Sequence, residues 1–189
     1  MAKSLKDLKE YLKKVPKDSI VLVNVAAANY FPTNMEILRF LCNEEALAGV
    51  YVTVNKPYDT IKRVLEEEKV NTKQLFFIDA ITKNAGGEGK NTEKVFYLDS
   101  PENLTGLGVA LSEAVNKIEG EYKFLFLDSL STLLLYHNSG TIAKFSHFLT
   151  GRMRMWGLRG ILISLEKETD PKLTSQLSQF CDLVVDIDK

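Results

Sequence analysis

An acidic residue closes the most hydrophobic segment of the sequence. The run Phe124-Leu125-Phe126-Leu127 is followed directly by Asp128, and such a run predicts a buried β-strand that ends in a carboxylate. A carboxylate in this position helps to hold Mg²⁺ in enzymes that transfer phosphoryl groups. An aspartate there can also simply cap the next helix. Taken alone, the pattern favours the cap and leaves a magnesium site open.

Glycines gather in a second segment that superficially looks like a phosphate-binding loop. It reads Gly86-Gly87-Glu88-Gly89-Lys90-Asn91. Asn84 stands where the first glycine belongs, Asn91 stands where serine or threonine is needed, and an extended segment follows instead of a helix. We therefore interpret residues 83–93 as a surface loop.

The remaining reactive side chains are scattered along the chain. His137 and His147 are ten residues apart, with neither cysteines nor acids at ligand-like spacing. Cys42 and Cys181 lie in apolar patterns without a CxxC motif, so we expect reduced thiols in the interior. Asp79 ends another apolar run and ranks below Asp128 as a candidate.

Three arginines and a tryptophan lie close together in residues 151–159. We interpret this segment as the end of a helix whose arginines face solvent, where they interact favourably with the helix dipole. If this segment has a function, we expect it to be part of an interaction surface, because arginine and tryptophan are enriched at protein interfaces.

The order of predicted elements indicates how these side chains are positioned. Apolar, β-branched runs predict strands at residues 20–25, 50–54, 75–79, 95–98, 124–128, 160–165 and 183–187. Helical spacing predicts helices at residues 4–15, from Met35 onward, at 58–68, 100–118 and 170–179, and across a long region broken near 138–140. Residues 25–34 are expected to form a loop, and Ser100 to cap the helix that follows it. This alternation predicts an α/β fold with a mainly parallel central sheet.

Composition limits the classes of protein to consider. The chain has 189 residues, 45% of them hydrophobic, and 24 basic against 25 acidic side chains give a formal net charge of −1. The size fits one domain, and the near-neutral charge makes nucleic acid an unlikely partner. No apolar run approaches the roughly 20 residues needed to span a bilayer, and the N-terminus lacks the apolar core of a signal peptide. We therefore expect a cytoplasmic protein without membrane insertion.

Several segments resemble the KaiC- and RadA-like proteins of the RecA superfamily, of archaeal type. Residues 124–134 are similar to their Walker B segment, 49–54 to their second core strand, and 100–108 to a segment of archaeal members. The resemblance covers residues 17–188. It implies a three-layer RecA-like P-loop NTPase fold, with residues 1–16 as an N-terminal helix and 17–189 as the single domain.

The same resemblance places the phosphate-binding loop, or Walker A motif, at residues 25–34. A working motif reads GxxxxGK[ST], whose glycines let backbone amides curl around phosphate and whose lysine neutralises its charge. This segment has no glycine and no lysine, so we interpret the Walker A motif as degenerate. The candidate nucleotide-binding residues are Ala28, Asn29, Tyr30, Thr33, Asn34 and Asp128, and Asp128 is also the candidate Mg²⁺ ligand.

The catalytic base that the resemblance implies is also missing. In KaiC-like relatives the second strand ends in glutamates, one of which activates the attacking water. Here Asn55, Lys56 and Pro57 follow that strand, and neither an amide nor an ammonium group accepts a proton from water at neutral pH. We therefore expect no catalytic residues.

These observations predict a pseudo-ATPase that acts in regulation or protein–protein interaction, through a protein partner or self-association and without a required cofactor. One alternative is an ATPase that binds the nucleotide through backbone amides at residues 28–34 and Mg²⁺ near Asp128, with a lysine such as Lys56 supplied from elsewhere in the chain. A second alternative is an accessory protein of DNA recombination or repair, which the near-neutral charge disfavours.

Overall fold

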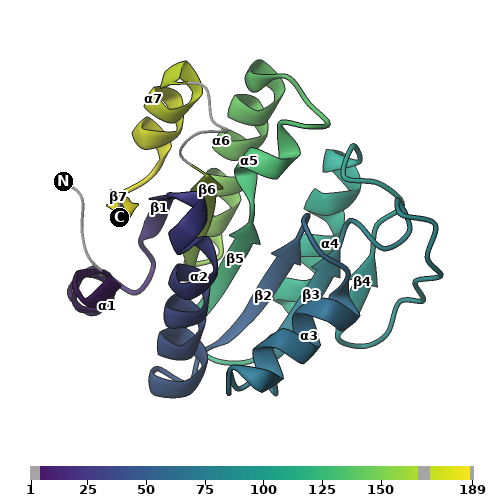
Figure 1. Cartoon of the computed structure of the whole chain (residues 1–189), viewed down its shortest axis with the longest axis horizontal. Helices are drawn as coiled ribbons and strands as arrows, with labels where there is room; N and C mark the ends of the chain where they lie inside the picture. The colour runs from purple at the N-terminus through teal and green to yellow at the C-terminus, as the bar shows by residue number, and fades with distance from the viewer. Residues whose placement is uncertain (1–4, 166–170, 188–189) are drawn as a thin grey trace.

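A single parallel sheet organises the molecule. The structure is a computed structural model that describes residues 5–165 and 171–187. Seven strands lie in the order β4-β3-β2-β5-β6-β1-β7 (Figure 1), and each neighbouring pair is parallel. The strands are β1 (Ile20–Val25), β2 (Ala48–Thr53), β3 (Leu75–Asp79), β4 (Val95–Tyr97), β5 (Lys123–Asp128), β6 (Leu158–Leu165) and β7 (Leu183–Ile187). The predicted α/β fold with a parallel sheet is confirmed.

Helices cover both faces of the sheet and complete three layers (Figure 1). One face carries α1 (Leu5–Lys14), the 3₁₀ turn η1 (Ala27–Asn29), α2 (Tyr30–Arg39), the π-helical turn η2 (Phe40–Glu44) and α3 (Tyr58–Glu67). The other face carries α4 (Leu104–Lys117), α5 (Leu130–Leu133), α6 (Ser139–Met155) and α7 (Pro171–Phe180). None of the helices in the described part of the chain is long and apolar enough to cross a membrane.

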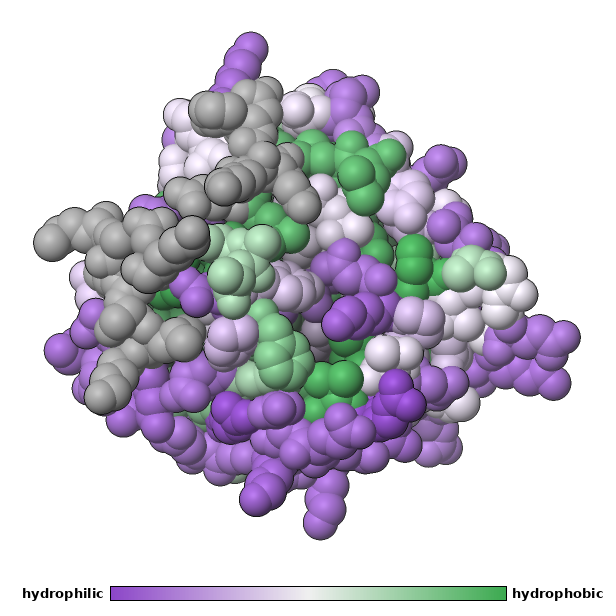
Figure 2. Space-filling view, in the orientation of Figure 1, coloured by the Kyte–Doolittle hydropathy of each residue, from purple (hydrophilic) through white to green (hydrophobic). Residues whose placement is uncertain are grey.

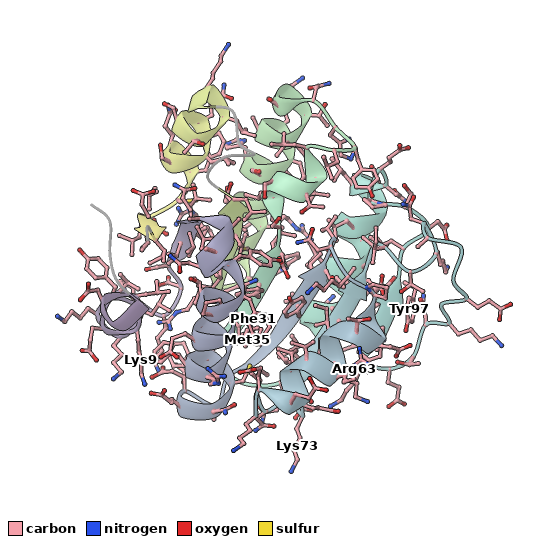
Figure 3. The ribbon with its side chains drawn as sticks, viewed as in Figure 1. Lys9, Phe31, Met35, Arg63, Lys73 and Tyr97 are labelled. Carbon is pink, nitrogen blue, oxygen red and sulfur yellow. The ribbon has the colours of Figure 1, made fainter. Side chains whose placement is uncertain are left out.

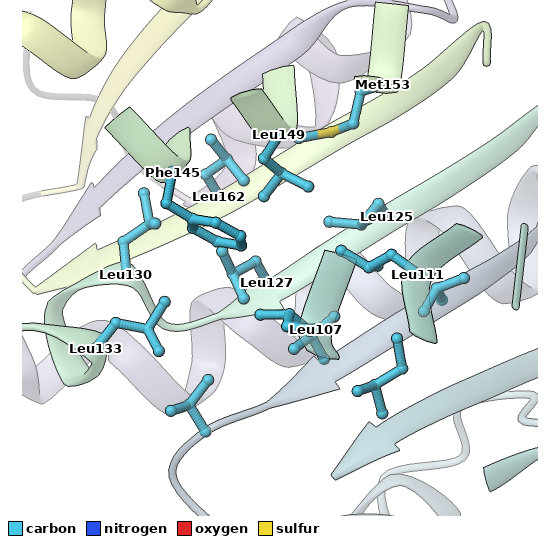
Figure 4. Packing of buried hydrophobic residues seen from close by; sticks show 14 of the residues in the cluster. Leu107, Leu111, Leu125, Leu127, Leu130, Leu133, Phe145, Leu149, Met153 and Leu162 are labelled. Atoms are coloured by element: carbon cyan, nitrogen blue, oxygen red, sulfur yellow. The ribbon is translucent and has the colours of Figure 1, made fainter. Parts of the chain in front are cut away.

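Alternating side chains of β5 fill both layers of the core. Leu125 and Leu127 pack with Phe145 of α6 on one face (Figure 4), whereas Phe124 and Phe126 pack against the α2 side. All of these side chains are buried. A strand buried on both faces is apolar along its whole length, which explains why β5 is the most hydrophobic segment in the sequence.

The N-terminal helix shares this core. Leu8 and Leu12 are one helical turn apart and fully buried, and they belong to the same apolar cluster as β1 and α2. Helix α1 therefore packs on the sheet layer next to α2. The division into residues 1–16 and 17–189 stays a prediction.

The expectation of a loop at residues 25–34 is wrong. A 3₁₀ turn at Ala27–Asn29 leads directly into α2, which begins at Tyr30. The Asn29 amide donates to the Ala26 carbonyl at 2.8 Å. Pro32 lies in the first turn of α2, where no amide donor is required.

The start of α4 also differs from the expectation. Asn103, rather than Ser100, caps this helix, because its Oδ1 accepts a hydrogen bond from the Gly106 amide at 2.7 Å. Ser100 instead stabilises the preceding turn, where its hydroxyl accepts from the Glu102 amide at 3.1 Å. The side-chain oxygens of serine and asparagine serve equally as caps, so the sequence did not distinguish them.

One arginine of residues 151–159 departs from the expectation that these side chains face solvent. Arg154 does so and pairs with Asp182 at 3.0 Å. Arg159 instead lies in β6 with 1% of its surface exposed, and its Nε and Nη1 atoms have no hydrogen-bond partner among the residues that the structure describes. Burial lowers the pKa of its guanidinium. Arg159 pairs in register with Phe124, near the start of β5, far along the strand from Asp128.

Candidate functional site

Asp128 lies where the connections of two neighbouring strands diverge. β2 and β5 pair with each other, and Thr53 is the register partner of Asp128. The chain leaves β2 through α3 toward β3, but it leaves β5 through α5 and α6 toward β6 on the other side. Such a switch point opens a crevice at the carboxyl ends of parallel strands, and ligands of α/β proteins bind there.

The Asp128 carboxylate accepts hydrogen bonds from three side chains. The Tyr30 hydroxyl donates to Oδ1, and the Asn55 amide donates to the same atom at 3.1 Å. The Tyr51 hydroxyl donates to Oδ2 at 2.5 Å. Asn55 also donates to the Tyr30 hydroxyl at 2.8 Å. Both carboxylate oxygens therefore have partners from within the chain.

Burial shifts the pKa values of this group of side chains. Asp128 is 2% exposed, and loss of solvation raises the pKa of its carboxyl, against the opposing effect of Tyr30, Tyr51 and Asn55. The pKa values of both tyrosine hydroxyls are also raised, first by burial and then by the charge of Asp128. The tyrosines therefore remain protonated donors at neutral pH.

The residues that follow Asp128 form the other side of the crevice. The peptide bond between Asp128 and Ser129 is cis. Ser129 caps α5, since its hydroxyl accepts from the Thr132 amide at 3.3 Å. The Thr132 hydroxyl in turn donates to Oδ1 of Asn55. This chain of contacts fixes the Asn55 amide so that its Nδ2 faces Asp128 and Tyr30.

Little space remains beside the carboxylate. The cavity there has a volume of about 20 Å³, enough for roughly one water molecule. Phe31 and Met35 project from α2 toward the space between α2 and α3 (Figure 3). The cavity is lined by Tyr30, Phe31, Asn34, Met35, Tyr51, Lys56, Ile61, Val64 and Asp128.

The structure brings together only some of the residues predicted to form a nucleotide site. Tyr30 contacts Asp128 directly, and Asn34 lines the same cavity. Ala28 and Asn29 lie in the 3₁₀ turn and do not line it, and Thr33 is fully buried within α2. Lys56, considered as a substitute for the missing lysine, lines the cavity, and its charge lowers the pKa of Asp128.

Sequence reasoning missed the role of Tyr51. Its ring packs in the core, with its centroid 5.2 Å from that of the Phe126 ring and 5.8 Å from that of the Phe77 ring. The sequence therefore indicates only an ordinary core aromatic residue at this position. Strand alternation was the available signal. Tyr51 and Asp128 project from the same face of neighbouring strands, and a buried tyrosine hydroxyl requires a partner.

Asp79, the second candidate acid, has a different role. Its carboxylate accepts hydrogen bonds from the backbone amides of Tyr58, Ile81 and Thr82, at 2.7 to 2.8 Å, and from the Thr82 hydroxyl at 2.5 Å. These donors join the start of α3 to the turn after β3. Asp79 therefore organises the backbone at its strand end.

Nothing in the described ranges suggests a metal centre of several side chains. No group of three histidine, cysteine, aspartate or glutamate residues is placed to hold an ion there. Cys42 and Cys181 are free, and burial raises the pKa of each thiol to about 12. The His147 ring packs on Phe180 at 4.9 Å.

Sequence comparison assigns the chain to a family. DUF7504, a family of unknown function, matches residues 33–187. This chain belongs to that family. No protein with a curated function matches it.

Solved structures from the archaeon Pyrococcus horikoshii share the fold. A KaiC-like protein is 15% identical with a TM-score of 0.62, over 90% of this chain and 72% of that one. An uncharacterized protein in complex with an unknown peptide is 15% identical with a TM-score of 0.73, over 97% and 83%. A third protein is 13% identical with a TM-score of 0.64, over 99% and 89%. At these identities the likeness shows the fold, which is RecA-like with three layers.

The residues at the crevice do not fit the magnesium–nucleotide complex that a RecA-like fold implies. The volume beside Asp128 is far smaller than the several hundred Å³ of a ligand site. Phosphate binding requires backbone amides without other partners, but those of Ala26, Asn29 and Tyr30 donate to backbone carbonyls. Tyr30, Tyr51 and Asn55 already bond to the carboxylate that would assist Mg²⁺.

Proposed function

We propose that this DUF7504 member is a KaiC-like domain that does not hydrolyse ATP and acts in the cytoplasm by binding another protein. In this proposal residues 25–34 are a degenerate Walker A segment whose second half lies in α2. The fold is retained because it presents a surface to a partner, in a regulatory or scaffolding role.

The contact between Tyr30 and Asp128 carries the first half of the proposal. Tyr30 begins α2, at the place where the resemblance expects a phosphate-binding loop, and its hydroxyl bonds to the Walker B-like carboxylate. Asn55 occupies the position at which the resemblance expects a glutamate, and its amide donates hydrogen bonds to both the Tyr30 hydroxyl and the Asp128 carboxylate. Phosphoryl transfer depends on charge stabilisation and positioning, and the described residues beside Asp128 supply neither a phosphate cradle nor a base.

Protein binding rests on a separate observation. One of the similar structures is described as a complex with an unknown peptide, and that protein shares the fold of nearly this whole chain. We extend peptide binding to this chain, whose described surface includes a groove of about 710 Å³ away from the crevice. A volume of this size is typical of ligand sites.

Phosphate release from ATP and Mg²⁺ tests the loss of hydrolysis. We expect the purified chain and its Asp128→Ala variant to release phosphate at the same background rate. A rate in the unmodified chain that Asp128→Ala abolishes would contradict the proposal and restore the ATPase alternative. A rate that both proteins share, and that varies between preparations, identifies a contaminant and leaves the chain inactive as proposed.

A further inference from the structure

The layer formed by α4 to α7 contains the largest hollow described above. On the opposite face, shown in Figure 2, hydrophobic residues form small areas separated by hydrophilic ones. In the α4–α7 layer, α6 packs closely on α7, but α4 and α6 approach each other much less. The groove between them, here called the α4–α6 groove, is lined by Leu104, Thr105, Gly108, Val109, Ser112, Glu113, Asn116, Thr141, Lys144, Phe145, Phe148 and Arg152.

Both walls present apolar side chains to solvent. Val109 on α4 is 55% exposed and Phe148 on α6 is 50% exposed, so two large apolar residues face the same hollow. Gly108 allows the Phe148 ring to approach α4 closely, since a Cβ at position 108 would lie 3.3 Å from that ring. Exposed apolar residues that gather in one hollow mark an interaction site.

The walls also carry charged side chains that form no ion pair with another described residue. Lys144 and Arg152 lie two turns apart on α6, and neither pairs with a described acid; Glu113 on α4 pairs with no described base. Neighbouring Arg154, which points elsewhere, is paired with Asp182. The groove therefore has a basic wall on α6 and an acidic residue on α4.

Two contacts hold the Arg152 side chain in place. Its Nη2 donates to the Ser112 hydroxyl at 2.9 Å, across from α6 to α4, and its guanidinium lies 4.5 Å from the centroid of the Trp156 ring. Its Nε is buried and has no hydrogen-bond partner within the described part of the chain. A guanidinium held in this way favours a carboxylate, with which it forms charge-assisted hydrogen bonds.

We propose that the α4–α6 groove binds an amphipathic helix of a partner protein whose apolar face is flanked by carboxylates on the α6 side. This inference rests on the proposed protein-binding function and names its site and the chemistry of its partner. Apolar side chains of the helix contact Val109, Phe145 and Phe148, and its acidic flank meets Lys144 and Arg152.

A helix suits this groove better than an extended peptide. Both walls are helices, whose backbone groups bond within each helix, so they offer an extended chain few backbone partners. An extended peptide would bury unpaired amides and carbonyls, which is unfavourable. A helix satisfies its own backbone and presents apolar residues at i, i+3, i+4 and i+7, the usual mode of helix-in-groove recognition.

Designed peptides test the proposal with defined probes. The binding of three fluorescent helical peptides is compared by anisotropy. The first carries leucines on one face, flanked by glutamates. The second carries the same leucines flanked by lysines, and the third keeps the glutamates but has serines in place of the leucines. We expect the leucine–glutamate peptide to bind at least about tenfold more tightly than either of the others. Equal binding of the glutamate and lysine peptides would overturn the proposal.

Variants with matched controls locate the site. Lys144→Glu should weaken binding of the leucine–glutamate peptide about tenfold, whereas Lys62→Glu on α3 should leave it unchanged. Phe148→Ser should weaken binding in the same way, whereas Leu135→Ser, at an 80% exposed position outside the groove, should not. All four side chains are exposed, and circular dichroism checks that each variant folds.

The outcomes separate this inference from the proposed function. If neither Lys144→Glu nor Phe148→Ser changes the affinity for the peptide, the assignment of the groove is overturned. The proposed protein-binding function then stands, with its site on another surface of the chain. ATP turnover by a chain that binds the peptide at the groove contradicts the proposed loss of hydrolysis only. Sedimentation that shows a dimer broken by Phe148→Ser overturns the inference, since a second copy would then be the occupant.

Discussion

The hydroxyl of Tyr51 donates a hydrogen bond of 2.5 Å to Oδ2 of Asp128, from β2 to the neighbouring strand β5. Both groups are buried. The contact joins the residue that most resembles a catalytic acid to a side chain of the aromatic core. Asp128 is therefore held by the fold itself, which supports a structural role for a position that assists Mg²⁺ in working P-loop enzymes.

Removing this hydroxyl should destabilise the protein. Tyr51→Phe keeps the ring packed on Phe77 and Phe126 but leaves a buried carboxylate oxygen without its donor. We expect the free energy of unfolding to fall by about 1–3 kcal/mol, measured by urea denaturation. Tyr58→Phe is the control, because Tyr58 also contacts the Phe77 ring but does not bond to Asp128. It should change stability by less than about 0.5 kcal/mol.

The raised pKa of Asp128 predicts the sign of a pH dependence. Burial raises the folded-state pKa above the ordinary value of 3.8, so the folded chain binds this proton more tightly than the unfolded chain. That contribution to stability is complete below the ordinary pKa and is lost as pH rises through the folded value. Asp128→Asn lacks this titration.

Chemical denaturation of both proteins at several pH values checks this prediction. The stability of Asp128→Asn relative to the unmodified chain should increase as pH rises from about 4 to about 7. A constant difference would contradict this prediction by showing that the hydrogen bonds from Tyr30, Tyr51 and Asn55 balance burial, and a change in the opposite direction would show that they outweigh it.

The two candidate caps of α4 can be distinguished by substitution. Asn103→Ala removes the acceptor of the Gly106 amide and should cost about 1 kcal/mol of stability. Ser100→Ala affects only the preceding turn and should cost less than about 0.5 kcal/mol. A larger loss for Ser100→Ala, measured by thermal or urea unfolding, would favour the cap expected from the sequence.

Two glycines should respond to alanine with opposite signs. A Cβ at Gly49 in β2 would lie 2.4 Å from the ring of buried Phe124, so Gly49→Ala should destabilise the protein by about 1–3 kcal/mol. A Cβ at Gly151 in α6 would meet no atom within 4 Å, so Gly151→Ala should stabilise it by up to about 1 kcal/mol. A Gly49→Ala variant as stable as the unmodified chain would contradict the packing of β2 against Phe124, and a destabilising Gly151→Ala would contradict the open space found at that position.

Hydrophobic patterns predict most of the fold because they report burial directly. The strands at residues 20–25 and 75–79 have the predicted bounds, and their order led to the correct fold class. Helix starts are harder to predict. They depend on which of several polar side chains reaches a free amide, and both the loop expected at residues 25–34 and the cap expected at Ser100 were wrong.

The candidate site was predictable only in part. Asp128 was identified because a carboxylate is unusual at the end of so apolar a strand. Tyr30 was named only as a possible nucleotide contact, and its bond to Asp128 depends on α2 beginning five residues after β1. Tyr51 is indistinguishable from a core aromatic until the register of β2 and β5 places its hydroxyl beside the carboxylate.

Calorimetry of ATP and Mg²⁺ binding tests the central claim most directly, at protein concentrations that detect millimolar affinity. The unmodified chain and Asp128→Ala are titrated in parallel. We predict no heat of binding for either protein, because Tyr30, Tyr51 and Asn55 occupy the crevice at Asp128 and only about 20 Å³ remains beside it. Clear binding to the unmodified chain that is lost in Asp128→Ala would contradict the account and show that the crevice opens to admit nucleotide.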